Sequence, residues 1–237
     1  NRSLVYWNIG VYQGSHGTDL AALKRYLPKI EAHFFIVHHN SDNPRFPDWL
    51  LEEPKILKIF VIDVPTNVSH PKIVVIPLGL NPQKRERVVR QLMAGIENAS
   101  HVQPADFMMV KGFTLGRGHS RHSKGLPRKE NRKRWLRHIA PLFNTTLRRA
   151  TTEHIDPSDY YSLMRHHQYV LSLPGTGMDC FRTWEALYAG RVPVVSDWLH
   201  HSVYHELPVV RTELKNLTVL ELEDAWRRFS RPAARYN

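Results

Sequence analysis

The stretch Tyr169–Ser196, YVLSLPGTGMDCFRTWEALYAGRVPVVS, decides the fold. Its apolar runs Tyr169–Leu173 and Val192–Ser196 have the length and composition of buried strands. Between them lie a glycine-bearing loop, Pro174–Gly177, and a predicted helix, Cys180–Ala189. This order predicts two parallel strands joined by a crossover helix. In such a unit the loop and the helix N-terminus lie at the carboxyl edge of the sheet, where α/β folds bind ligands.

Both ends of the predicted helix carry recognisable signals. Asp179 stands at the N-terminus, where an aspartate side chain commonly caps the first turn. Gly190 stands where a helix often ends in a left-handed residue. We therefore expect Asp179 to be the N-cap and Gly190 to have a positive φ.

Arg182 lies in the first turn of this helix, where the helix dipole disfavours a cation. Glu185 is three residues further on and on the same face. One interpretation is a surface ion pair, although arginine before glutamate is the weaker orientation. The other is a ligand site, in which Arg182 binds a diphosphate and Glu185 accepts the hydroxyls of a ribose. The spacing alone leaves both open.

This stretch resembles the C-terminal signature of exostosin-type glycosyltransferases. The matching residues are Gly175, Thr176, Gly177, Met178, Asp179, Arg182, Trp184–Leu187, Gly190 and Val192–Val195. Further upstream, His39–Asp42, His70–Lys72 and Ile76–Leu80 resemble blocks of small exostosin-like proteins. The resemblance spans roughly residues 33 to 218.

The resemblance implies an α/β protein with two Rossmann-like halves of the GT-B type, in a truncated or minimal form. It also implies an inverting transfer of a sugar from a nucleotide-sugar donor, a uridine nucleotide first of all, to a hydroxyl of a glycan or glycoprotein acceptor. We expect an acceptor-side half at residues 1–100 and a donor-binding half at 101–237. The donor-binding residues are expected to be Gly175, Thr176, Gly177, Asp179, Arg182 and Glu185, together with Arg128 and Arg132.

Outside the central stretch, periodicity predicts further strands and helices in alternation. The expected strands are 3–9, 34–37, 56–62, 73–76, 107–113 and 207–210, and the expected helices are 18–27, 83–96, 128–139, 157–166 and 219–229. Residues 98–105 have no periodicity and are the best linker candidate.

One segment, residues 111–137, creates the basic character of the chain. It contributes ten Lys or Arg and a single acid, Glu130, to a chain whose net charge is +11. Three interpretations compete: a solvated face, an anion-binding segment for the donor or an acidic acceptor, and a nucleic-acid patch. The last would favour interleaved aromatic residues, and only Phe113 and Trp135 are present. We expect Arg128, Lys129, Arg132 and Lys133 on an exposed helix face.

The sequence favours chemistry without a metal ion or other cofactor. No D-x-D triplet occurs, and that carboxylate pair is what metal-dependent sugar transferases use to bind Mn²⁺. Among the fifteen histidines, His201 and His205 have the spacing of a metal pair but no third ligand of matching spacing. Protein cations and helix dipoles are then expected to neutralise the leaving nucleoside diphosphate.

The expected reaction is a single displacement, with a base in the N-terminal half that deprotonates the acceptor hydroxyl. Asp42 and His39 follow a predicted strand and are the base candidates, with Asp19 as a third. Asp42 is equally suited to a turn before Pro44.

Five N-x-S/T sequons, at Asn1, Asn67, Asn98, Asn144 and Asn216, favour the Golgi or another secretory-pathway lumen. No run of 18 apolar residues is present, and we expect any membrane anchor to lie in a missing N-terminus. The single cysteine, Cys180, excludes an internal disulfide and is either a packing residue or a thiol activated by the helix N-terminus. Two other functions stay open: a degenerate domain that binds acidic glycans without turnover, and a nucleic-acid-binding module, although no nucleic-acid partner is expected.

Overall fold

The fold is described from a computed structural model of the 237-residue chain. The described residues are 2–8, 15–39, 46–64, 68–80, 86, 104–113, 129–152, 155, 157–175, 177–198 and 201–229. In this part of the chain, no helix is long and apolar enough to cross a bilayer.

The described part of the chain contains both strands and helices. The strands are β1 (Arg2–Asn8), β2 (His33–His39), β3 (Ile56–Val61), β4 (Ile73–Val75), β5 (Asp106–Met109), β6 (His167–Ser172), β7 (Val192–Ser196) and β8 (Val210–Thr212). The α-helices are α1 (Ser15–Tyr26), α2 (Asp48–Glu52), α4 (Lys129–Leu142), α5 (Leu147–Thr152), α6 (Pro157–Arg165), α7 (Phe181–Tyr188) and α8 (Val219–Phe229), and the short 3₁₀ helices are η1 (Leu27–Lys29) and η2 (His201–Tyr204).

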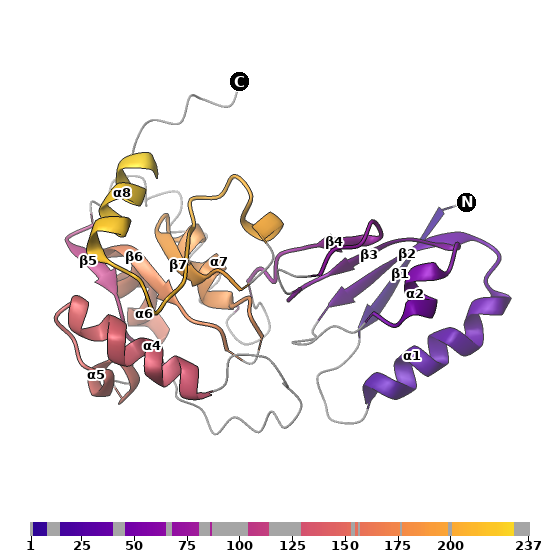
Figure 1. Ribbon diagram of the computed structural model, residues 1–237, viewed down its shortest axis with the longest axis horizontal. Helices are drawn as coiled ribbons and strands as arrows, with labels where there is room; N and C mark the ends of the chain where they lie inside the picture. The colour runs from indigo at the N-terminus through magenta and orange to yellow at the C-terminus, as the bar shows by residue number, and fades with distance from the viewer. Residues whose placement is uncertain are drawn as a thin grey trace. The chain divides into compact units, whose positions relative to one another are not determined.

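The strands form two four-stranded sheets, in the orders β1-β2-β3-β4 and β5-β6-β7-β8. Every pairing within them is parallel. Figure 1 shows the first sheet with α1 and α2, and the second with α4 to α8. The mixed α/β class with two parallel sheets, expected from the sequence, is therefore confirmed, and it is compatible with two Rossmann-like halves.

The chain divides into two compact units. The first comprises Asn1–Leu78, Thr176–Asp179 and Trp198–Val203, and the second comprises the remainder. The domain boundary expected near residue 100 lies outside the described residues.

Each unit has its own apolar core. In the first, Leu23 of α1 and Leu50 of α2 pack against strand residues that include Phe34 and Ile59. In the second, a cluster joins β5, α6, β6 and α7, and its buried members are Met109, Tyr161, Met164, Val170, Ala186 and Ala189. The helices thus pack on their sheets as the apolar periodicity requires.

Several boundaries differ from the sequence-based predictions. Helix α2 was not among the predicted helices, and it begins directly after Pro47, a residue whose fixed φ suits a helix entry. The strand expected at 207–210 is wrong: β8 begins at Val210, because the preceding residues make turn bonds from Leu207 N to Tyr204 O and from Val209 N to Leu207 O. The helix expected at 83–96 and the linker at 98–105 fall largely outside the described residues.

The predicted end of α7 is confirmed. Gly190 has φ +70°, and its N–H donates to Leu187 O at 3.0 Å. The next residue, Arg191, donates its N–H to Ala186 O at 2.9 Å. These two bonds form a Schellman motif, which ends the helix and turns the chain into β7. The last helix, α8, also follows its prediction, and Thr218 Oγ1 accepts from Glu221 N at 3.2 Å as its cap.

Replacing Gly190 with alanine should destabilise the fold through the backbone alone. A Cβ at Gly190 would point into open space, with no packing neighbour within 4 Å, so the left-handed φ is the whole cost, about 1–2 kcal/mol. Gly190→Asn is the matched variant, and it should cost less because asparagine tolerates this conformation. Urea unfolding measures both. Equal losses for the two variants would contradict the assignment.

Candidate functional site

The candidate site lies at the carboxyl edge of the second sheet. Because β5, β6 and β7 are parallel, the segments that follow them emerge at one edge. Lys111–Phe113 follows β5, and Leu173–Gly175 follows β6 and leads toward α7. Two arginine side chains from different helices reach these two segments.

Arg182 of α7 binds the segment after β5. Its Nη1 donates to Lys111 O at 3.1 Å and its Nη2 donates to Gly112 O at 2.6 Å. The guanidinium also lies over the ring of Phe113, with Cζ 4.2 Å from the centroid, and within 5.6 Å of that of Tyr160. These carbonyls and rings partly offset the unfavourable position of a cation at the helix N-terminus.

The contact between Arg182 and the segment after β5 depends on the glycine at position 112. Its φ is +72°, and a Cβ at this position would lie 3.5 Å from Arg182 Nη2 and 3.4 Å from Ile155 Cδ1. A glycine thus lets the main chain turn after β5 and come close to the arginine.

Arg132 of α4 binds the segment after β6. Its Nε and Nη2 donate to Pro174 O at 3.1 and 2.5 Å, and Nη2 also donates to Leu173 O at 3.3 Å. The side chain is half-buried, so the expectation that Arg132 lies on an exposed helix face is wrong. Arg132 lies on the inward side of α4, where its guanidinium reaches the main-chain carbonyls of Leu173 and Pro174.

The charge of Arg182 acts on the guanidinium of Arg132. Burial lowers the pKa of Arg132, Cys180 opposes this shift, and the positive charge of Arg182 adds to it. Gly175 is exposed beside Arg132, and a Cβ there would be 3.4 Å from Arg132 Nη2 and 4.0 Å from Cys180 Sγ. The fold therefore brings together three of the predicted residues: Gly175, Arg132 and Arg182.

Glu185 points into the second unit. It is 2% exposed, and Tyr161 Oη donates to its Oε1 at 3.0 Å. Glu185 and Arg182 thus have different partners, and the interpretation as a surface ion pair is wrong. On the same helix, Thr183 Oγ1 lies 2.9 Å from Ser172 Oγ, a buried hydrogen bond that joins α7 to the end of β6.

Asp179 does not cap α7, contrary to the prediction. The N-cap is Cys180, whose backbone is extended and whose side chain makes no capping bond. Asp179 is 4% exposed, its Oδ2 accepts from Leu78 N at 2.9 Å, and its own N–H donates to Asp63 Oδ1 at 2.5 Å. All three residues belong to the first unit. The Asp179 carboxylate therefore accepts from the main-chain N–H of Leu78, and not from the first turn of α7 as the local sequence predicted.

The remaining predicted residues vary in how far they are described. Gly177 is buried, and the Cys180 thiol donates to Leu173 O at 3.1 Å. His39 is the last residue of β2, with only its main chain described. Asp42, Thr176 and Arg128 lie outside the described residues, as does the side chain of Asp19.

Sequence reasoning missed the partners Gly112, Phe113, Tyr160 and Tyr161. Only Gly112 left a signal, as a glycine directly after an apolar strand, where a close main-chain approach is common. The aromatic partners carry no such signal, because an aromatic residue in an amphipathic pattern indicates core packing.

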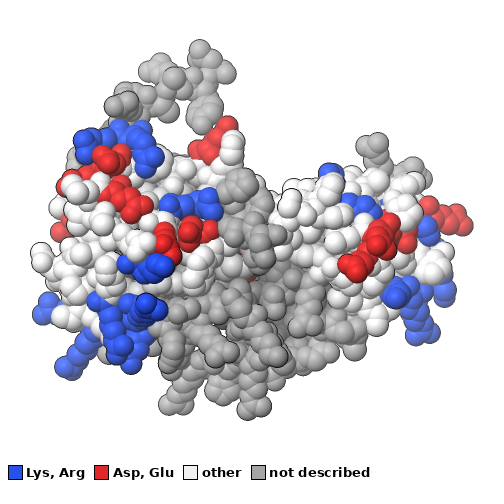
Figure 2. Space-filling view, viewed as in Figure 1, with Lys and Arg blue, Asp and Glu red and all other residues white. Residues whose placement is uncertain are grey.

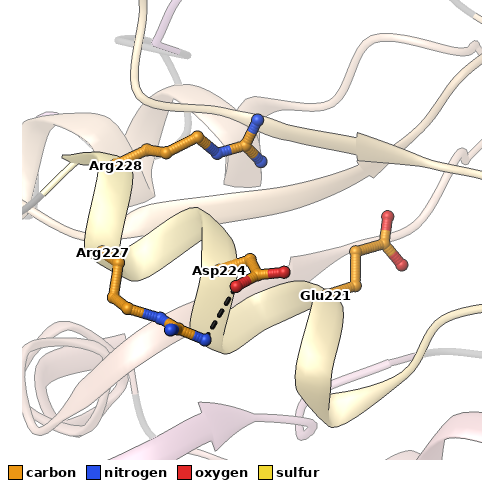
Figure 3. A pocket seen from close by; sticks show the side chains of 4 residues that line it. All are labelled: Glu221, Asp224, Arg227 and Arg228. Atoms are coloured by element: carbon orange, nitrogen blue, oxygen red, sulfur yellow. Dashed lines mark ion pairs between the residues drawn. The ribbon is translucent and has the colours of Figure 1, made fainter.

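An open hollow of about 440 Å³ lies elsewhere, along α8. Figure 3 shows its lining, Glu221, Asp224, Arg227 and Arg228, all from this one helix. Arg227 Nη2 pairs with Asp224 Oδ1 at 2.7 Å, and both side chains are about two-thirds exposed. Exposed, mutually paired charges are ordinary surface features, so we do not place the site here.

Comparison with known proteins adds no family. No protein-family model matches the chain, and no curated protein matches it. The resemblance to exostosin-type glycosyltransferases therefore stays a prediction based on the residues quoted above. Within the described residues, no group of three His, Cys, Asp or Glu is arranged to hold a metal ion.

Removing the Tyr161 hydroxyl tests the burial of Glu185. Tyr161→Phe should reduce the free energy of unfolding by about 1.5–3 kcal/mol, because a buried carboxylate loses a hydrogen bond. Tyr26→Phe, at a ring that is 52% exposed, is the matched control and should change stability by no more than about 0.5 kcal/mol. Denaturant unfolding of both variants measures these changes in the free energy of unfolding. Equal, small effects would show that the Tyr161–Glu185 bond contributes little.

Proposed function

We propose that the chain is a glycosyltransferase of the exostosin-like, GT-B type. It transfers a sugar from a nucleotide-sugar donor to a glycan hydroxyl with inversion at the anomeric carbon and without a metal ion. The donor is a nucleoside diphosphate sugar, with the uridine nucleotides first in order. The site that supports this function is the edge of the second sheet described above.

The arginine pair carries the proposal. Two cations that are close enough to interact, each bound to main-chain carbonyls at one sheet edge, repel each other. A diphosphate placed beside them removes this repulsion and accepts charge-assisted hydrogen bonds. A guanidinium has five N–H donors, and the two carbonyl bonds of Arg182 use two of them.

The main chain supports an anion at the same place. The N-cap Cys180 makes no side-chain capping bond to the first turn of α7, whose Thr183 N–H donates to Cys180 O at 3.0 Å. The N-terminus of a helix favours negative charge through its N–H groups and its dipole. Gly175 precedes this turn and is exposed, so a ligand can approach its main chain without a Cβ in the way, beside the Arg132 guanidinium.

The proposed reaction is a single displacement. The acceptor oxygen loses its proton to a base and attacks the anomeric carbon, while the bond from that carbon to the diphosphate oxygen breaks. Arg132 and Arg182 stabilise the charge that develops on the departing diphosphate. Asp42 and His39 stay the candidates for the base.

The role of Glu185 is weaker than that of the arginines. A carboxylate that is 2% exposed and bonded to Tyr161 reaches a ribose only if the neighbouring side chains rearrange. The proposal therefore rests on diphosphate recognition, and the ribose contact stays a prediction.

A secretory lumen is the proposed location. Two of the five sequons lie within the described residues, at Asn144 and Asn216, and both asparagines are exposed. Asn144 has φ +49° in the turn between α4 and α5, whereas Asn216 Nδ2 donates to Glu213 Oε2 at 2.6 Å. Surface turns of this kind accept glycans without disturbing the core.

Arg182→Met tests the site directly. Loss of the cation should lower kcat for transfer by about 10²-fold or more, because the leaving diphosphate is no longer stabilised. Stability should also fall by about 1–3 kcal/mol, since the carbonyls of Lys111 and Gly112 lose charged donors. Transfer from a panel of nucleotide sugars is measured well below the unfolding temperature of the variant.

Arg25→Met is the control for this substitution, because Arg25 is an exposed cation of α1. It should leave kcat within about twofold. Wild-type kcat in Arg182→Met would contradict the assignment. Absence of both transfer and hydrolysis in the wild-type protein across the whole panel would favour a binding domain without turnover.

Chelation tests the metal-independent mechanism. Protein cations are proposed to neutralise the diphosphate, so EDTA should leave the transfer rate within about twofold of that of the untreated enzyme. Complete loss on chelation, restored by Mn²⁺, would contradict this part of the proposal. The same assay with added Mn²⁺ and no chelator is the control.

A further inference from the structure

Asp63 is a buried carboxylate that the proposed reaction does not use. It follows β3 by two residues and is 1% exposed. Figure 2 shows many Asp and Glu side chains at the surface, where water solvates their charge. A carboxylate inside a protein needs hydrogen bonds that replace this water, so the partners of Asp63 indicate its role.

The main chain at Asp63 is in an uncommon conformation. Its φ is +60°, in the left-handed region that residues with a Cβ rarely adopt. Among the described residues, Asn144 and Glu206 are the other non-glycine residues with a positive φ, and both are exposed, whereas Asp63 is buried. Strained residues persist where the surrounding structure holds them, and they are concentrated at functional sites.

The Asp63 carboxylate binds the main chain of Asp179. Its Oδ1 accepts from Asp179 N–H at 2.5 Å, in a buried hydrogen bond. The Asp179 carboxylate in turn accepts from Leu78 N–H at 2.9 Å. Asp63 and Leu78 follow the neighbouring parallel strands β3 and β4. Asp179 is therefore held through its main chain and its side chain together.

Asp179 ends the glycine-bearing loop of the proposed donor site. The loop begins at Pro174, whose carbonyl oxygen accepts from Arg132, and the residue after Asp179 is Cys180, the N-cap of α7. Two glycines, at positions 175 and 177, lie between these anchors. Glycine has more conformational freedom than any other residue, so the path of this loop depends on the groups that hold its ends.

We infer that Asp63 is a positioning residue of the diphosphate site, an inference that rests on the proposed function. Its carboxylate fixes Asp179 and, through the chain, the exposed main chain of Gly175 and the first turn of α7, which carries Arg182. At 1% exposure, Asp63 does not touch the ligand itself. Its contribution is preorganisation, since a loop already held in its binding conformation loses less freedom when the ligand binds.

The conformation and the hydrogen bond make different demands on the residue at position 63. Glycine adopts a left-handed φ with little strain but has no side-chain acceptor. Asparagine tolerates this φ and has a side-chain oxygen in the equivalent place. Replacing Asp63 with each of them therefore separates the backbone conformation from the hydrogen bond.

The experiment measures UDP binding by calorimetry for the wild type, Asp63→Gly, Asp63→Asn and Glu206→Gly. Asp63→Gly should weaken binding by about tenfold or more, because the loop loses an anchor. Asp63→Asn should bind UDP within about threefold of the wild type, because it keeps the acceptor oxygen. Glu206→Gly is the matched control, since it removes a carboxylate from an exposed residue with φ +65°, and it should leave the affinity unchanged. Circular dichroism checks that each variant is folded at the temperature of the titration.

Equal UDP affinity in Asp63→Gly and the wild type would overturn the inference and leave the proposed function in place. Equal losses in Asp63→Gly and Asp63→Asn would also overturn it, because the acceptor oxygen would then not be the group that matters. No binding of UDP to the wild type would remove the proposed diphosphate site and the positioning role with it. If Asp63→Gly does not fold, hydrogen exchange provides the test: the Asp179 amide of the wild type and of Asp63→Asn should exchange slowly without ligand. Exchange as fast as in an unstructured peptide would overturn the inference.

Discussion

Main-chain carbonyls at the carboxyl edge of the second sheet hold two arginines in place. Arg132 and Arg182 come from different helices, and each donates to the segment that follows a different strand. These bonds fix the path of both segments, because a carbonyl that faces a half-buried guanidinium loses a strong partner if the chain moves. They also concentrate positive charge at one place. The same contacts thus fix the path of the main chain at this edge and the position of its two positive charges.

Helix α7 carries a cation and a buried carboxylate, which need different surroundings. Its Arg182 points toward the segment after β5, while Glu185, one turn later, is buried against Tyr161. Its Thr183 bonds to Ser172 at the end of β6, and the Schellman motif at Gly190 directs the chain into β7. Hydrogen bonds of the Arg182, Thr183 and Glu185 side chains therefore attach α7 to the rest of the second unit. An arginine at the N-terminus is tolerated because the surrounding fold, and not the helix itself, supplies its partners.

The elements predicted well from the sequence are those whose signals are local. Strand β7 and helix α8 have the predicted limits, because an apolar run or a capping threonine acts within a few residues. The side-chain partners of the site could not be predicted in this way. Asp179 accepts from Leu78, 101 residues away, and Arg182 donates to Lys111, 71 residues away. Tertiary packing determines such partners. Asp179 therefore does not cap α7 as predicted, and Glu185 is buried in the core.

Helix α4 explains why the basic segment resisted a single interpretation. Successive residues of a helix point about 100° apart, so neighbouring cations in a charged run face different surroundings. Arg132 points toward Pro174 and is half-buried, whereas Lys133 and Arg134 are exposed. Along the sequence, these three adjacent cations suggest a single basic patch. The helix separates them into one half-buried cation, Arg132, and exposed cations on the outer side of α4. The half-buried cation has a geometry fixed by carbonyl bonds, whereas the charges of the exposed cations are screened by salt.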